Sequence, residues 1–129
     1  MALPAPHAND RVKVLIADDE ELIADTLRKI LNGSGFDATA VYNGQHAVDV
    51  VRVWHPDIFL SDVMMPGLNG IEAAILVSRM APACRIVLFS GNSGTADLRL
   101  EAHAQGYDFQ FIEKPMHPRD LLAHLRRWA

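Results

Sequence analysis

The stretch IFLSDVMMPG, residues 58–67, decides the fold of this chain. Its apolar first part, Ile58–Leu60, predicts a buried strand, and Pro66 with Gly67 predicts a turn soon after it. Asp62 therefore stands at the C-terminal end of a buried strand, where open α/β sheets bind their ligands. A carboxylate at that depth destabilises the fold unless a cation or a hydrogen-bond donor meets it. The rest of the sequence supplies candidates for both partners.

The overall composition indicates one globular domain. The chain has 129 residues, of which 50% are hydrophobic, and a formal net charge of −4. Acidic and basic residues are interspersed, so no basic stripe indicates direct nucleic-acid binding. The single cysteine, Cys84, excludes an internal disulfide and fits a reducing compartment. No apolar run approaches the length of a membrane span, so we expect a cytoplasmic protein without membrane contact.

The first residues differ from the rest of the chain. Residues 1–10, MALPAPHAND, carry two prolines and no apolar core stretch. This composition is typical of neither a signal peptide nor a membrane anchor. We therefore expect a flexible N-terminal tail over residues 1–10 and a folded domain over residues 11–129.

Five apolar segments are predicted to be strands: residues 12–17, 36–41, 58–61, 85–89 and 109–113. A stretch with helical spacing of its apolar residues follows each of them. In the first helix, the apolar residues that recur with helical spacing are Leu22, Ile23, Leu27, Ile30 and Leu31. The fourth helix, residues 95–105, has only a thin apolar stripe. Five strands that alternate with five helices predict an α/β fold with a doubly wound parallel sheet.

Polar side chains follow four of the predicted strands. They are Asp18 and Asp19 after the first strand, Asp62 after the third, Ser90 after the fourth and Lys114 after the fifth. A parallel sheet brings these strand ends together at one edge. Two carboxylates about 4 Å apart repel by roughly 4 kcal/mol at an effective dielectric of about 20, so three of them raise a pKa or recruit a cation. An open set of carboxylates with a backbone carbonyl suits Mg²⁺, which pairs with phosphate oxygens.

The same residues suit phosphoryl transfer. Lys114 offers a point charge, and Ser90 a hydroxyl donor, to phosphoryl oxygens. Asp62 remains as the nucleophile, an established role for carboxylates that form aspartyl phosphates. Little more is needed, because this chemistry depends on in-line positioning and on stabilising charge. Taken alone, Asp18 or Asp19 could instead cap the next helix, and Ser90 could be a turn residue.

Four motifs, in this order, resemble the receiver domain of response regulators in bacterial two-component signalling. They are VLIADDEEL (14–22), PDIFLSDVMMPGLNGIE (56–72), IVLFSGN (86–92) and FIEKP (111–115). The resemblance covers Val12 to Trp128 and is of the chemotaxis-regulator type. It implies a flavodoxin-like (βα)5 fold with a five-stranded parallel sheet in the order 2-1-3-4-5.

The resemblance also implies the metal site. Asp62 would be the phosphoacceptor and would contact a Mg²⁺ ion. Asp19 would bind that ion directly, whereas Asp18 would bind it mostly through water. The main-chain carbonyl of Met64 would complete the protein ligands.

Three further roles follow from the same resemblance. Ser90, in place of the more frequent threonine, and Lys114 would bind the phosphoryl group. Phe111 matches the aromatic residue whose change of rotamer accompanies activation, together with the movement of Ser90. Met64 and Asn92 flank the phosphoryl group and tune its hydrolysis. Because Met64 cannot orient an attacking water, we expect a phosphorylated form that is not among the shortest-lived.

The implied activity is that of a switch, which catalyses only its own phosphorylation and autodephosphorylation. A sensor histidine kinase or a histidine phosphotransfer protein would donate the phosphoryl group in a Mg²⁺-dependent reaction. The face formed by the fourth helix, fifth strand and fifth helix would then change and regulate a downstream target or an effector domain outside this chain. A homodimer is possible, and no direct contact with nucleic acid is expected.

Three other functions are open to such a chain. A flavodoxin-like electron carrier needs a hydroxyl- and glycine-rich loop after the first strand, but Asp18-Asp19-Glu20 stands there. A Mg²⁺-dependent phosphohydrolase with an aspartate nucleophile has its two acids two residues apart, whereas Asp18 and Asp19 are adjacent. A degenerate receiver that only binds partners would lack part of the site, and no part is missing from this sequence.

Overall fold

A computed structural model, which describes residues 11–91 and 95–127, shows the predicted alternation of strands and helices. The strands are β1 (Lys13–Ala17), β2 (Asp37–Val41), β3 (Ile58–Asp62), β4 (Arg85–Ser90) and β5 (Gln110–Glu113). The helices are α1 (Glu21–Asn32), α2 (Gly44–Trp54), α3 (Gly70–Met80), α4 (Thr95–Ala104) and α5 (Pro118–Arg126). The predicted strands therefore differ from the observed ones by a single residue at one end.

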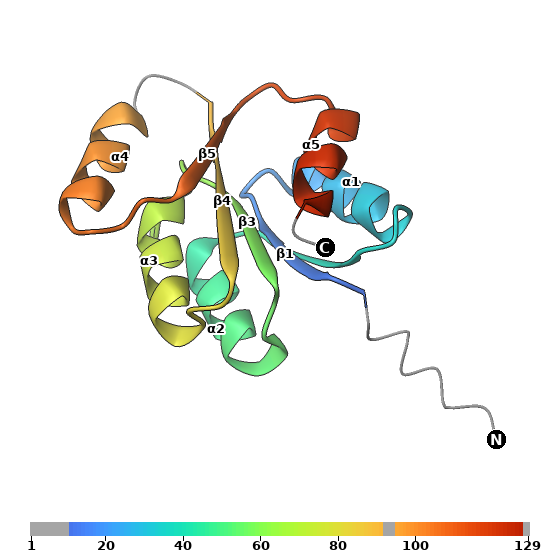
Figure 1. Cartoon of the computed structure of the whole chain (residues 1–129), viewed down its shortest axis with the longest axis horizontal. Helices are drawn as coiled ribbons and strands as arrows, with labels where there is room; N and C mark the ends of the chain where they lie inside the picture. The colour runs from blue at the N-terminus through green and yellow to red at the C-terminus, as the bar shows by residue number, and fades with distance from the viewer. Residues whose placement is uncertain (1–10, 92–94, 128–129) are drawn as a thin grey trace.

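The strands form one parallel sheet in the order β2-β1-β3-β4-β5, which confirms the predicted topology. Figure 1 shows α1 and α5 on one face of the sheet and α2 and α3 on the other, with α4 beyond α3. The chain first builds outward from β1 to β2 and then continues on the other side of β1 with β3. Such a reversal is the point where open α/β sheets bind ligands at their carboxyl ends.

Two apolar layers hold the helices on the sheet. Successive strand residues point to opposite faces, so Leu15 contributes to the layer beneath α2 and α3, whereas Val14 and Ile16 contribute to the layer beneath α1 and α5. β3 is buried along its whole length, including the polar Ser61 and Asp62 at its end. A central strand covered on both faces explains why its sequence is nearly all apolar.

The first turn of α1 is exposed. Leu22 is 80% exposed and Ile23 is 37% exposed, although both belong to the helically spaced apolar residues. Ala24 and Leu31 are the residues of α1 that are fully buried. The sheet therefore covers α1 from Ala24 onward, and its first turn faces solvent beside the strand ends.

Helix α4 is held by few apolar contacts, as its thin stripe predicts. Ala102 is its one buried residue among those whose side chains the structure describes, and Leu100 is 67% exposed. Few buried apolar contacts are typical of elements with low local stability.

Some expectations concern residues outside the described part of the chain. The predicted flexible tail, residues 1–10, belongs to this group, as do Asn92 and Trp128. Among the described residues, no helix combines the length and apolar character that crossing a membrane requires.

Candidate functional site

The sheet register places the predicted acidic residues side by side. In the β1–β3 ladder Ala17 is paired with Ser61. Asp18 follows Ala17 in the chain, and Asp62 follows Ser61. Neighbouring parallel strands lie about 4.8 Å apart, so side chains at equivalent places are within contact distance. The prediction that Asp18 and Asp62 meet at the carboxyl edge is therefore confirmed by the backbone pairing itself.

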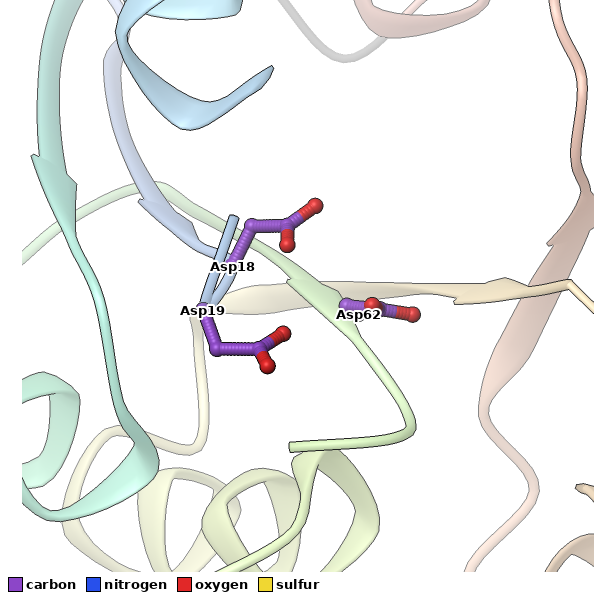
Figure 2. Close-up of side chains that lie close together, drawn as sticks. All are labelled: Asp18, Asp19 and Asp62. Atoms are coloured by element: carbon purple, nitrogen blue, oxygen red, sulfur yellow. The ribbon is translucent and has the colours of Figure 1, made fainter. Parts of the chain in front are cut away.

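Three carboxylates form a compact acidic cluster, which Figure 2 shows gathered beyond the ends of β1 and β3. One carboxylate oxygen from each of Asp18, Asp19 and Asp62 lies within 4.8 Å of the other two. Asp18 is only 2% exposed and Asp62 is 9% exposed, whereas Asp19 is open to solvent. Asp18 Oδ1 also accepts a hydrogen bond of 2.9 Å from the backbone N–H of Glu20, which fixes its orientation. The cluster is thus rigid on its inner side and open on its outer side.

Lys114 supplies the cation of the site. Its Nζ lies 3.4 Å from Asp62 Oδ2 and 3.5 Å from Asp18 Oδ2. The backbone N–H of Lys114 donates to the carbonyl of Ser90 at 3.0 Å, which joins the end of β5 to that of β4. Burial lowers the pKa of the Lys114 ammonium, but the attraction of Asp62 and Asp18 outweighs burial, so this pKa lies above its ordinary value. Lys114 is therefore charged throughout the physiological range.

Asp62 is a carboxyl group whose charged form is destabilised by its surroundings. Burial raises the pKa of its carboxyl above the ordinary 3.8, Lys114 lowers it, and the neighbouring Asp18 raises it again. The net direction is upward because burial has the largest effect on this carboxyl. Three carboxylates and one ammonium also leave a negative formal charge in the cluster. The uncompensated negative charge makes this edge of the sheet receptive to a second cation.

The raised pKa leads to a prediction about stability. Asp62→Asn is expected to raise the free energy of unfolding at pH 7 in Mg²⁺-free buffer by about 1 kcal/mol, because a neutral amide removes the buried charge. A carboxyl whose pKa is higher in the folded state destabilises the fold once it ionises. The gain is therefore full above the raised pKa and disappears as the pH falls toward 3.8. Urea titrations at several pH values measure it.

The solvent-exposed Asp49 of α2 provides the control for this measurement. Asp49→Asn should not raise the free energy of unfolding at pH 7. Saturating Mg²⁺ should remove the advantage of Asp62→Asn, because only the wild type would gain stability from the ion. Equal free energies of unfolding for wild type and Asp62→Asn at pH 7 without Mg²⁺ would contradict the inference that the charged form of Asp62 destabilises the fold.

Ser90 and Met64 border the cluster along the backbone. Ser90 ends β4, one residue past Phe89, which is paired with Asp62 in the sheet. Met64 lies in the loop between β3 and α3, two residues after Asp62, and its side chain is 48% exposed. The structure thus brings Asp18, Asp19, Asp62 and Lys114 into direct proximity, with Ser90 on the next strand and Met64 on the adjoining loop.

Phe111 lies on β5 in a half-buried environment, away from the carboxylates. The guanidinium carbon of Arg99, on α4, lies 4.4 Å from the centroid of its ring. This distance is that of a cation–π contact, which contributes about 0.5–1 kcal/mol at an exposed site. The sequence reasoning missed Arg99. The only signal for it was a basic residue on a helix whose apolar stripe is thin.

Comparison with known proteins agrees with this geometry. The family model described as the response regulator receiver domain matches residues 14–126. The chain belongs to this family. Receiver domains are signalling domains of bacterial two-component systems, not classical enzymes.

Curated relatives of this receiver domain are longer response regulators. The DNA-binding response regulator MtrA of Mycobacterium tuberculosis is 36% identical over 118 residues, which are 90% of this chain and 50% of that protein. MtrA of Mycobacterium leprae gives the same values. The receiver domain described here therefore spans about half the length of these relatives.

Solved structures share the fold of this receiver domain. A CheY-like receiver domain protein from Methanospirillum hungatei superposes with a TM-score of 0.82 at 22% identity, covering 91% of this chain and 92% of that one. The chemotaxis protein CheY4 of Vibrio cholerae superposes with a TM-score of 0.79 at 25% identity, covering 92% of this chain and 99% of that one. These likenesses confirm the flavodoxin-like fold.

Proposed function

We propose that this receiver domain is a switch operated by phosphorylation of Asp62. The observation that carries the proposal is the environment of this carboxylate. Asp62 lies at the end of a buried strand, within 4.8 Å of two further carboxylates and 3.4 Å from the Lys114 ammonium. An acidic cluster with a single fixed cation suits the transfer of a charged phosphoryl group when a metal ion is present.

The donor set fits a Mg²⁺ ion. Oxygen atoms of Asp18, Asp19 and Asp62 are close enough to share one ion, and carboxylate oxygens are the ligands that Mg²⁺ prefers. We assign Asp19 and Asp62 as direct ligands, Asp18 as a ligand mostly through water, and the main-chain carbonyl of Met64 as the remaining protein ligand. When bound, the ion would neutralise the carboxylates and polarise the phosphoryl oxygens.

The protein groups have distinct parts in the transfer. A carboxylate oxygen of Asp62 forms a bond to phosphorus while the bond from phosphorus to the donor histidine nitrogen breaks, and that nitrogen keeps the electron pair of the broken bond. Lys114 would move from its pairing with Asp18 and Asp62 to a phosphoryl oxygen. Ser90 would donate its hydroxyl to another oxygen, which draws the end of β4 toward Asp62.

The output surface proposed here is the face formed by α4, β5 and α5. Ser90 lies at the end of β4 and Phe111 on the neighbouring β5, so a movement of Ser90 has a short path to the aromatic ring. Phe111 contacts Arg99 of α4, a helix with few buried apolar contacts. A loosely held helix linked to the proposed switch residue is consistent with a surface that changes on phosphorylation.

The donor would be a sensor histidine kinase or a histidine phosphotransfer protein, and the receiver unit would span residues 11–129. Its target would be a partner or an effector domain outside this chain, as the greater length of the MtrA relatives suggests. We place the protein in the cytoplasm, where such kinases present their phosphohistidine. Homodimer formation belongs to the same proposal, whereas direct contact with nucleic acid does not.

Acetyl phosphate tests the proposal without a partner protein. Incubation with Mg²⁺ is expected to add one phosphoryl group per chain, detected as the intact mass. Excess EDTA should abolish the adduct, because the carboxylates then repel the incoming phosphoryl group. A chain that forms no adduct with Mg²⁺ would overturn the proposal and favour a binding-only receiver. Turnover of a small phosphate ester would instead support a phosphohydrolase, and a bound chromophore an electron carrier.

A further inference from the structure

We infer that Gly44, the first residue of α2, is a positioning residue for the loop that completes the phosphorylation site. The loop runs from Val63 to Asn69 between β3 and α3, and it carries Met64. Gly44 lies in another element, and it has no side chain with which to contact the carboxylates. The inference rests on the magnesium site proposed above and concerns which part of the fold holds that site in place.

The base of the loop is closed by close backbone packing. The N–H of Gly70 donates to the carbonyl of Val63 at 2.8 Å, which joins the two ends of the loop. A Cβ atom on Gly70 would lie 2.0 Å from the carbonyl oxygen of Asp62 and 2.9 Å from Cα of Val63. The start of α3 is therefore pressed directly on the backbone of the proposed phosphoacceptor, and the loop ends cannot shift independently of Asp62.

The far side of the loop rests on Gly44. A Cβ atom on Gly44 would lie 2.4 Å from the carbonyl oxygen of Leu68 and 3.1 Å from its Cβ. Distances under 3.0 Å from a backbone atom cannot be relieved by turning a side chain, so either α2 or the loop would have to move. Figure 1 shows α2 and α3 on the same face of the sheet. The distances at Gly44 and Gly70 place the start of each helix against this loop.

The loop is the part that would yield. Ala47, Val48 and Val51 hold α2 in the core, and the side chain of Asn43 caps the helix by accepting from the N–H of His46 at 2.7 Å. In the middle of the loop Met65 is buried, but Met64, Pro66 and Gly67 are exposed, so the loop is less restrained than α2. With both loop ends fixed, a push on Leu68 displaces the segment between them. That segment includes Met64, whose carbonyl is the proposed fourth metal ligand.

The sequence contains the same residue pair at the start of α2 and of α3. An Asn-Gly pair stands at the start of both helices, Asn43-Gly44 and Asn69-Gly70, and in each pair the asparagine caps the helix. The sequence alone relates these pairs only to helix starts. The structure adds that both glycines pack on the same loop from its two ends.

Magnesium binding distinguishes a positioning role from a merely structural one. Thermal unfolding of wild type and Gly44→Ala is measured in EDTA and in saturating Mg²⁺, and the Mg²⁺ dissociation constant is measured by calorimetry. Gly44→Ala is expected to weaken Mg²⁺ binding about tenfold or more, as loss of support for a metal ligand does, and to reduce the Mg²⁺-induced rise of Tm. A lower Tm in both buffers with an unchanged rise would overturn the inference.

Two further variants make the test decisive. Gly33→Ala introduces the same atom at the end of α1, remote from the loop, and should keep wild-type Mg²⁺ affinity. Leu68→Ala trims the side chain that packs this part of the loop against the core and adds no atom to any element. It should weaken Mg²⁺ binding several-fold even if Gly44→Ala fails to fold, and unchanged affinity in Leu68→Ala would overturn the inference. A wild type without any Mg²⁺ response would instead overturn the proposed metal site itself.

Discussion

Asp62→Asn is expected to form no phosphoryl adduct with acetyl phosphate and Mg²⁺ under conditions that phosphorylate the wild type fully. The amide oxygen is a poor nucleophile, and the variant also loses one anionic metal ligand. The substitution hardly changes side-chain size, so the sheet and the pairing of Lys114 with Asp18 remain. Intact mass measures the adduct. The expected effect is a complete loss of adduct formation, because Asp62 is the proposed phosphoacceptor.

The same variant should be at least as stable as the wild type in Mg²⁺-free buffer, so lost reactivity could not be attributed to unfolding. Asp49→Asn, at an exposed carboxylate of α2, is the matched control and should react like the wild type. An adduct of undiminished yield in Asp62→Asn would place the phosphoacceptor elsewhere. Peptide mapping would then show whether Asp18 or Asp19 of the same cluster had reacted.

Lys114→Met has the second largest expected effect, a loss of roughly 10²-fold in the initial rate of adduct formation. Removal of a preorganised cation from a site where charge develops has a cost of this order. The ammonium lies within 3.5 Å of both Asp18 and Asp62, so it has only a short distance to move to a phosphoryl group on Asp62. Methionine keeps an unbranched side chain that is one atom shorter, and it removes the charge and the hydrogen-bond donors.

Lys114→Met should also lower the free energy of unfolding in Mg²⁺-free buffer at pH 7 by about 1–2 kcal/mol. Breaking a fully buried ion pair costs more, but Lys114 retains partial access to water. Because its pKa is raised in the folded state, the stabilisation by Lys114 is present at neutral pH and is lost as the pH rises past 10.5 through the folded pKa. Adding Mg²⁺ should restore part of the loss. Lys29→Met, at an exposed lysine of α1, should change neither quantity.

Most of the fold could be predicted because its physical signals are local. Strands that are covered on both faces are apolar throughout, and Ile58–Leu60 has this composition. The polar Ser61 and Asp62 that follow therefore indicate the end of the strand. The acidic cluster followed from topology, because parallel strands leave their C-terminal residues at one edge. The register of β1 and β3 then placed Asp18 beside Asp62, as that reasoning requires.

The remaining features depend on distances that no pattern encodes. Helical periodicity gives Leu22 and Ile23 the same weight as Leu31, but it does not show where the sheet stops covering α1. The contact of Arg99 with Phe111 joins two elements separated by a loop, and nothing in either segment specifies that approach. For the same reason, the helix-opening glycines gave no indication of the loop against which they pack.

The place of the site in the sheet has a consequence for local unfolding. Asp18 and Asp62 directly follow two strands that lie at the centre of the sheet, and β3 is buried along its entire length. Backbone amides in such strands exchange with solvent only when the whole domain opens, whereas a sparsely packed helix such as α4 opens far more often. The proposed phosphorylation of Asp62 would thus take place on a part of the molecule that we expect to exchange slowly. Its proposed output would be carried by α4, which we expect to open locally while the strand ends stay folded.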